Sequence, residues 1–248
     1  MKKYIQTLLP LIACILLCAP AAMAKKDKED KENNDDKRIE VKVWFKDGRV
    51  YEGLMPKHWL TYRQTFINPG HNFHIVSPDD PDKTIKCEAS DVDSILITAS
   101  THESFEAGDF YLPAPKISFK KGKYKLIRRV SAGRNIDFCK MPYIGNCVVA
   151  GMNMDQRIEM WYIRFKDTGE VVSFFAYPLQ DGCQKPRFDP SNLASRVKKT
   201  NPGLSEAVMQ RFTSKDKETH KKYAADVMEN PQLFVDFVDE YLTNHPAE

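Results

Sequence analysis

The stretch IEVKVWFKDGRVYEGLM, residues 39–55, decides the fold of the first domain. Four apolar residues recur in it at every second position: Ile39, Val41, Val43 and Phe45. This period of two is the pattern of a strand that buries one face. Asp47-Gly48, a dipeptide typical of hairpin turns, follows at once. The stretch therefore predicts an antiparallel hairpin whose second strand spans 49–55.

Strand-like composition continues as far as residue 185. Short strands are expected over 72–76, 84–88 and 94–98, with a single helical turn over 89–92. Later strands are expected over 123–129, 135–139, 157–165 and 170–177. Turn signals separate these segments, which favours antiparallel pairing.

Helical signals begin after Pro186. Asp189-Pro190, Asn201-Pro202 and Asn230-Pro231 each place a capping or turn residue before a proline, which is favoured in the first turn of a helix. A further helix is expected from Ser214 to Glu229. The sequence as a whole predicts a mainly β fold with C-terminal helices, of the α+β class.

Two stretches resemble the SH3-like and Sm-like small barrels in layout: VKVWFKDGRVYEGLM, residues 41–55, and KCEASDVDSILI, residues 86–97. The resemblance implies a five-stranded barrel over 38–100. Sm-like proteins bind RNA through a motif rich in Arg and Gly before the last strand, whereas residues 90–93 here read Ser-Asp-Val-Asp. The RNA site does not carry over, and no nucleic acid is expected as a partner.

We expect the chain to contain three folded parts. An SH3-like barrel over 38–100 precedes a second antiparallel β domain over 101–185 and a C-terminal helical segment over 186–248. The whole chain also resembles exported bacterial proteins with no assigned activity, a resemblance that implies no role for any residue.

The first 24 residues have the features of an export signal. Lys2 and Lys3 precede an apolar run, and Ala22-Met23-Ala24 supplies the small residues that signal peptidase accepts. We expect a signal peptide over 1–24 and a periplasmic or secreted mature protein. The alternative is a lipid anchor, because Leu11-Ile12-Ala13-Cys14 resembles a lipobox with Cys14 as the acylated residue.

Residues 25–37, KKDKEDKENNDDK, contain nothing apolar and predict a disordered charged linker. The whole chain has a formal net charge of +3, and loss of Lys2 and Lys3 with the signal brings basic and acidic residues close to balance. Bulk charge therefore predicts no polyanionic partner. No second apolar run approaches membrane-spanning length, so no transmembrane span is expected in the mature chain.

Four cysteines follow the signal: Cys87, Cys139, Cys147 and Cys183. In an exported chain an even count suggests up to two disulfides. The short loop favours a Cys139–Cys147 bond, which leaves Cys87 for Cys183. The alternative is four buried free thiols, because cysteine is also a small apolar core residue.

Basic residues concentrate between residues 115 and 140. The candidate binding residues there are Lys121, Lys123, Lys125, Arg128, Arg129 and Arg134. A strand that carries them would present a positive face to an anionic envelope component, such as a lipid headgroup or acidic glycan. The alternative is an ordinary solvated sheet face whose charges pair with nearby acids.

Catalytic and metal-binding signatures are missing. The sequence has no G-x-S-x-G elbow, no glycine-rich phosphate loop and no C-x-x-C pair. His71 and His74 are three apart, and on a strand such residues point to opposite faces. No catalytic residue, cofactor or metal is expected, although the sequence leaves enzymatic activity open.

We therefore expect an exported bacterial envelope protein with a non-enzymatic binding or scaffolding role, whose partner is an anionic envelope component or another envelope protein. One alternative is a ligand-binding protein for an anionic lipid or glycan, with the basic residues of 116–134 as its site. The other is an envelope hydrolase whose Cys and His residues, distant in sequence, meet in a cleft.

Overall fold

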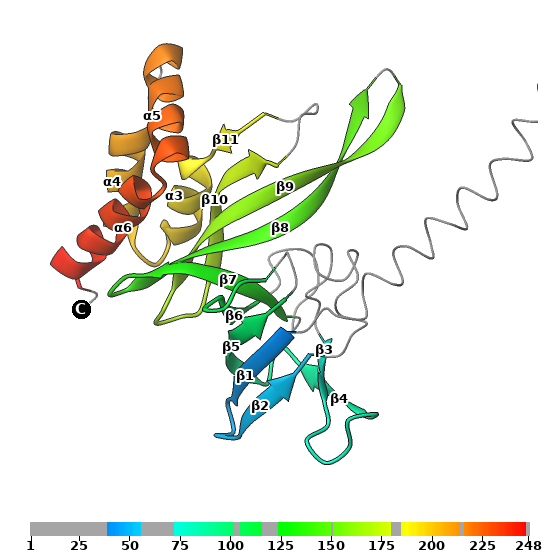
Figure 1. The fold of residues 1–248 in the computed structure, drawn as a ribbon. Coiled ribbons are helices and arrows are strands. Elements are labelled where there is room, and N and C mark those ends of the chain that lie inside the picture. Colours follow the sequence, from blue (N-terminus) through cyan, green and yellow to red (C-terminus); the bar gives the residue numbers. More distant parts are fainter. Residues whose placement is uncertain are drawn as a thin grey trace, which may run out of the picture.

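The computed structural model describes residues 39–55, 72–101, 105–115, 124–149, 151–179, 185–213 and 216–246. Their fold is mainly β with C-terminal helices (Figure 1). A nine-stranded sheet has the order β11-β10-β9-β8-β7-β6-β5-β1-β2, and a hairpin of β3 and β4 forms a second sheet. All the strand pairs are antiparallel. The predicted fold class is thereby confirmed at the level of a mainly β chain with helices at its end.

The strands are β1 (Ile39–Phe45), β2 (Val50–Leu54), β3 (Asn72–Val76), β4 (Thr84–Glu88), β5 (Val92–Ser100), β6 (Phe110–Pro115), β7 (Tyr124–Ala132), β8 (Ile136–Val149), β9 (Met152–Phe165), β10 (Val171–Pro178) and β11 (Arg187–Phe188). The helices are α3 (Pro190–Val197), α4 (Pro202–Phe212), α5 (Lys217–Glu229) and α6 (Gln232–Asn244). None of these four helices has the length and apolar character needed to cross a bilayer.

The hairpin of β1 and β2 forms where the alternation and the turn dipeptide predict it. Val43 is paired with Tyr51, and the N–H of Phe45 donates to the carbonyl of Arg49 at 2.9 Å. Gly48 has a φ of 87°, a conformation that glycine adopts without steric cost. The buried residues of β1 are the alternating apolar ones, Ile39, Val41 and Val43.

Strands β3 and β4 have the predicted bounds and pack against β1 and β5. Phe73, Ile75 and Cys87 of this hairpin share an apolar core with Val43 of β1 and Ile95 of β5. The prediction of a helical turn over 89–92 is wrong. Residues 89–91 form a hydrogen-bonded turn, with Asp91 N donating to Glu88 O at 3.0 Å, and β5 begins at Val92.

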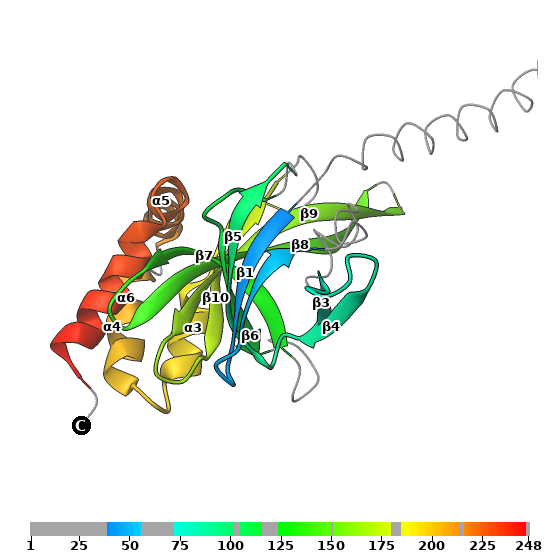
Figure 2. The ribbon, with the colours of Figure 1, turned by 60° about the horizontal axis from the view of Figure 1, so that its bottom comes forward.

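The main sheet continues across residue 100, where the sequence predicts a domain boundary. Strand β6 pairs with β5 through Ile95–Tyr111 and Leu96–Phe110, and with β7 through six residue pairs. Apolar cores nevertheless form separately at the two ends of the sheet. In both views the helices lie at one end of the molecule and the β3–β4 hairpin at the other (Figures 1 and 2).

Strands β8 and β9 form a hairpin of 14 residues on each side, longer than the predicted segments. The helices cover one face of β8, β9 and β10. Phe138, Trp161 and Phe174 of the sheet share a core with Leu204 of α4 and Phe234 of α6. Burial of this aromatic core holds the helical segment on the sheet.

Two of the predicted helix starts are confirmed by their caps. The Asp189 side chain accepts from Asn192 N at 3.2 Å at the start of α3, and Asn201 Oδ1 accepts from Leu204 N at 2.9 Å at the start of α4. In each helix a proline follows in the first turn, where its missing N–H costs nothing.

Candidate functional site

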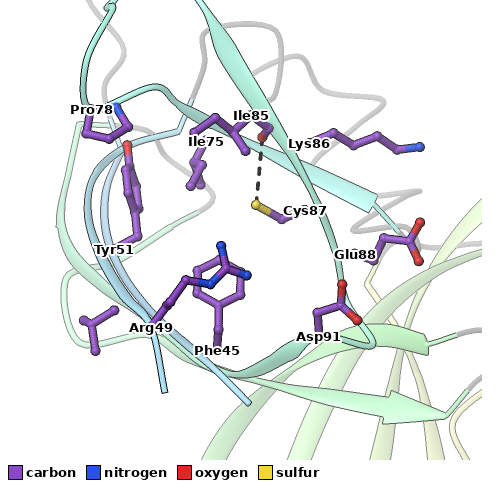
Figure 3. A pocket seen from close by; sticks show the side chains of 11 residues that line it. Phe45, Arg49, Tyr51, Ile75, Pro78, Ile85, Lys86, Cys87, Glu88 and Asp91 are labelled. Carbon is purple, nitrogen blue, oxygen red and sulfur yellow. Dashed lines mark hydrogen bonds between the residues drawn. The ribbon is translucent and has the colours of Figure 1, made fainter. Parts of the chain in front are cut away.

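A hollow of about 280 Å³ lies between strand β2 and the β3–β4 hairpin (Figure 3). Its apolar lining comes from four strands and the loop between β3 and β4: Phe45, Val50, Tyr51, Ile75, Pro78 and Ile85. Charged residues and one thiol complete it: Arg49, Lys86, Cys87, Glu88 and Asp91. Polar and apolar groups thus contribute about equally to the lining. Ligand sites are usually concavities in which polar groups converge beside apolar surface.

The hollow exists because β2 and β3 do not join into one sheet. Strand β2 ends the nine-stranded sheet, and β3 pairs with β4 alone. A side chain bridges the two strands instead. Tyr51 donates its hydroxyl to Val76 O at 2.5 Å and accepts from Leu54 N at 3.2 Å. Burial raises the pKa of Tyr51, so the hydroxyl remains a donor at neutral pH.

The bottom of the hollow is buried, whereas two apolar side chains at its mouth reach solvent. Ile75 is only 3% exposed, but Val50 is 52% and Ile85 43% exposed. Scattered apolar residues are common on surfaces. Val50 and Ile85 differ from such scattered residues because both line the same hollow.

Charge in the hollow is compensated unevenly. Arg49 Nε lies 2.7 Å from Asp47 Oδ2, and its guanidinium lies over the ring of Phe45 at 4.9 Å from the ring centre. Glu88 and Asp91 lie next to one another at one side of the hollow (Figure 3). Within the described part of the chain, no basic side chain lies within 4.0 Å of either carboxylate.

The backbone of Lys46 lies beside that of Asp91, since the Lys46 N–H donates to Asp91 O at 2.9 Å. The Lys46 ammonium contacts other groups. Lys46 Nζ donates to Ser90 O at 2.7 Å and lies 5.0 Å from the ring centre of Tyr124. Lys86 also lines the hollow, on the same face of β4 as Glu88, so the charged lining consists of two basic and two acidic side chains.

Cys87 points its sulfur into the hollow, at 3.9 Å from Ile85 O (Figure 3). Burial raises the pKa of this thiol to about 11, against a smaller lowering by Arg49. A thiol in that state is not a nucleophile at neutral pH. His74 neighbours Phe73, the partner of Cys87, and alternation directs its side chain to the opposite face of the hairpin.

The described residues also contain no group of three or more His, Cys, Asp or Glu side chains that could hold a metal ion. The hollow thus combines apolar surface, one buried thiol and charged side chains of both signs.

Strand β2 adds unpaired backbone groups beside the hollow. The bonds from Phe45 N to Arg49 O and from Met55 N to Ile39 O fix the alternation, so Val50 and Glu52 direct their N–H and C=O groups away from β1. No hydrogen bond to these groups occurs within the described residues. A free sheet edge of this kind pairs readily with another extended chain.

Two of the six predicted basic residues, Arg128 and Arg129, lie on opposite faces of β7. Arg128 pairs with Tyr111 and lies 3.3 Å from Asp109, whereas Arg129 pairs with Phe110 on the opposite face and stacks over that ring at 3.9 Å. Arg134 is exposed in the turn before β8, and Lys125 is half-buried on β7. Lys121 and Lys123 lie outside the described residues.

The predicted Cys139–Cys147 disulfide does not fit strand β8. The two positions are eight residues apart on one continuous strand, which separates their Cα atoms by roughly 26 Å. A disulfide needs its Cα atoms within about 7 Å. Cys87 and Cys139 are both buried free thiols, and Cys183, the predicted partner of Cys87, lies outside the described residues.

Sequence reasoning did not find the hollow. Its residues come from β1, β2, β3, β4 and the turn after β4, and only the packing of the hairpin brings them together. Of the lining residues, Asp91 belongs to the acidic stretch over 90–93 that departs from the Sm-like pattern, but this departure does not indicate a hollow. No protein-family model, curated protein or solved structure matches the chain.

Proposed function

We propose that this chain is an exported, non-enzymatic binding module of the bacterial envelope, and that the hollow beside β2 is its site. Its ligand is an extended segment of another envelope protein. The observation that carries the proposal is the apolar hollow of about 280 Å³ directly beside an unpaired strand edge. The edge supplies backbone hydrogen bonds and the hollow receives one side chain, which is how sheet-edge recognition gains affinity and specificity.

The finer architecture belongs to the same proposal. Strands β1 to β5 form an SH3-like barrel that stays open between β2 and β3, and the hollow occupies the opening. The shared core of β1, β3, β4 and β5 supports this arrangement. Export, through a signal peptide over 1–24 or a lipid anchor on Cys14, places the module in the periplasm, outside the cell or at a membrane surface.

The two other functions considered from the sequence have less support. A site for an anionic lipid or glycan across 116–134 is weakened because Arg128 and Arg129 lie on opposite faces and Arg128 is already paired with Asp109. A Cys/His hydrolase is weakened by the buried, protonated thiols of Cys87 and Cys139.

Capped heptapeptides of the form acetyl-Ser-Thr-Thr-X-Thr-Thr-Ser-amide test the proposal, with X as norleucine or serine. They are titrated into the ¹⁵N-labelled full-length protein and followed by ¹H–¹⁵N NMR. We expect saturable shifts at Val50, Glu52 and Cys87, and about tenfold tighter binding for norleucine, because one buried aliphatic side chain contributes about 1.5–3 kcal/mol.

Two protein variants locate the binding. Ile85→Glu places a charge at the mouth of the hollow and should abolish the shifts. Leu233→Glu, on α6, is the matched control because Leu233 is 50% exposed, similar to Ile85. Absence of saturable shifts at the hollow for both peptides would contradict the proposed function.

A further inference from the structure

We infer that Tyr51 is a positioning residue of the hollow, because its hydroxyl holds the β3–β4 hairpin at the distance from β2 that the ligand side chain requires. The inference rests on the proposed function and names the residue that sets its selectivity. Tyr51 lies on β2, and its hydroxyl donates to the carbonyl of Val76, the last residue of β3, at 2.5 Å. The same oxygen accepts from Leu54 N at 3.2 Å, which fixes its direction.

The hairpin is anchored differently at its two ends. At one end Phe73 and Cys87, which are paired with each other, lie in the core shared with β1 and β5. The turn that follows β4 is bonded to β1 there, through Lys46 N and Asp91 O at 2.9 Å. At the other end residues 77–83 form the turn of the hairpin, and β2 and β3 are not paired as strands. Tyr51 therefore contacts the hairpin near the end opposite these anchors.

The end that Tyr51 holds carries one apolar wall of the hollow. Pro78 and Ile85 line the hollow from this part of the hairpin, and the Tyr51 hydroxyl points toward Pro78 (Figure 3). Phe45 and Val50 line it from β1 and β2. An aliphatic side chain between the walls is held best when both touch it, because a gap of roughly 0.5–1 Å forfeits much of the dispersion attraction.

The Tyr51 hydroxyl acts on the hairpin and not on the ligand, since it is already bonded to the protein as donor and as acceptor. Gly53 makes this position possible, because a Cβ there would lie 2.2 Å from the hydroxyl oxygen. Tyr51→Phe keeps the ring in the lining and deletes the bond to Val76. A change of ligand preference in this variant therefore reports the position of the hairpin.

The norleucine and serine heptapeptides separate the two parts of the site, because both can pair with the edge of β2 but norleucine alone fills the hollow. We expect Tyr51→Phe to lower the preference for norleucine over serine from about tenfold to about threefold or less, with serine binding unchanged. Gly53→Ala, which displaces the same ring by a clash, should lower the preference in the same way.

Binding should in turn hold the hairpin, because the coupling between two equilibria is reciprocal. At equal occupancy the norleucine peptide should slow amide hydrogen exchange in β3 and β4 more than the serine peptide does. In Tyr51→Phe this protection by norleucine should be larger, because the unbound hairpin opens more often.

Two variants outside the site are the matched controls. Tyr223→Phe removes a hydroxyl from α5, where the tyrosine ring lies 6.4 Å from that of Phe212. Asp239→Ala weakens the fold elsewhere, since Asp239 accepts from Arg134 N and Asn135 N. Both variants should keep the preference of about tenfold for norleucine. Loss of the preference in either control would assign the effect to a general loosening of the fold and overturn the inference.

Three further results would overturn it. An unchanged norleucine preference in Tyr51→Phe would leave the proposed function standing and remove the positioning role. Equal weakening of both peptides would place the effect of Tyr51 at the edge of β2 instead of the hollow. Absence of saturable shifts for both peptides in the original chain would overturn the proposed function together with this inference.

Discussion

Asp239 of α6 accepts hydrogen bonds from two successive backbone N–H groups of the turn between β7 and β8. Arg134 N lies 2.7 Å and Asn135 N 2.6 Å from its two carboxylate oxygens. The Asn135 side chain returns two bonds to the helix, to Asp239 O at 3.2 Å and Thr243 Oγ1 at 2.8 Å. This clamp joins the last helix to the central strands of the sheet.

Removal of the clamp should loosen α6. Asp239→Ala deletes two charge-assisted hydrogen bonds and leaves two N–H groups without their acceptor, so we expect a loss of about 2–4 kcal/mol in the free energy of unfolding. Urea unfolding followed by circular dichroism measures it. Glu240→Ala, an exposed acid one residue further along α6, should change stability by less than about 0.5 kcal/mol. Equal effects of the two variants would refute the importance of the clamp.

Gly133 makes the close approach of Asp239 possible. A Cβ at this position would lie 2.4 Å from Asp239 Oδ2 and 3.1 Å from Ile136 O, far inside contact distance. Gly133→Ala should therefore destabilise the protein by about 2 kcal/mol or more. Gly108→Ala, where a Cβ meets nothing within 4 Å but φ is +96°, isolates the backbone strain and should cost about 1 kcal/mol.

A double-mutant cycle separates the clash from other effects. In an Asp239→Ala background the Gly133→Ala change should cost much less, because the atom nearest to the new Cβ is gone. Additive costs in the double variant would show that the alanine strains the turn itself rather than meeting Asp239.

Local patterns were sufficient to predict the elements whose structure depends on near neighbours. The alternation from Ile39 to Phe45 and the Asp47-Gly48 turn predict β1 and its hairpin, and the Asp189 cap predicts the start of α3. Strand β6 was not among the predicted strands, and its Pro113 and Pro115 are unfavourable inside a sheet. It forms nonetheless, since pairing with β5 and β7 and burial of Leu112 and Ala114 outweigh the lost donors.

The candidate site could not be predicted from local sequence patterns, because it depends on contacts between residues that are far apart in the sequence. Arg49 and Glu88 are far apart in the sequence, and only the packing of the β3–β4 hairpin on β1 and β5 makes them line one hollow. Adjacency in the sequence is also a poor guide to a shared surface. Consecutive residues of a strand point to opposite faces, so Arg128 and Arg129 lie on opposite faces of β7.

Tyr51 should control how firmly the β3–β4 hairpin is held beside β2. Tyr51→Phe removes the bond to Val76 O and leaves the carbonyl without this donor. We expect faster amide hydrogen exchange in β3 and β4, and unchanged exchange in α4 and α6, because local opening depends on local contacts. Global stability should fall by about 1–2 kcal/mol.

Gly53 provides a second route to the same effect. A Cβ at residue 53 would lie 2.2 Å from the Tyr51 hydroxyl oxygen, so Gly53→Ala should displace the tyrosine ring. We therefore expect faster amide hydrogen exchange in the same β3–β4 hairpin. Uniform acceleration across the helices for either variant would show that Tyr51 supports the whole fold rather than this contact.

Cys87 and Cys139 should react slowly with alkylating reagents in the folded protein. Burial raises the pKa of Cys87 to about 11 and that of Cys139 to about 12, so both stay protonated at neutral pH. Iodoacetamide labelling of the native, unreduced protein, mapped by mass spectrometry, should be slow at both sites and fast in guanidinium. Labelling that requires prior reduction would show that these cysteines form disulfides.

The same thiols should make stability depend on alkaline pH. The folded pKa values lie above that of an unfolded cysteine, about 8.5, so the stabilisation is complete below that pH. This stabilisation should fall as the pH rises above about 8.5 and through about 11 and 12, the pKa values of Cys87 and Cys139 in the folded protein. In that range only the unfolded chain releases the thiol protons. Urea midpoints across this range measure the slope, which Cys87→Ala/Cys139→Ala should reduce.

The buried pair of Asp137 and Arg164 should behave as a mutually dependent unit. Arg164 Nη1 lies 3.2 Å from Asp137 Oδ2, and the Asp137 side chain is only 3% exposed. Asp137 Oδ1 and Arg164 Nε are buried without a hydrogen-bond partner, so the pair is imperfectly satisfied. Arg164→Met should cost about 3 kcal/mol or more, because it leaves a buried carboxylate with only Lys166 at 3.8 Å.

Replacement of both partners should cost less than replacement of one. In Asp137→Leu/Arg164→Met no buried charge remains, and apolar contact offsets the lost ion pair, so we expect stability within about 1–2 kcal/mol of the original chain. Lys166→Met is the matched control, since the Lys166 side chain is 37% exposed and its contact with Asp137 is long, and it should cost less than about 1 kcal/mol. A double variant less stable than Arg164→Met would show that the ion pair itself, despite its unsatisfied atoms, stabilises this part of the sheet.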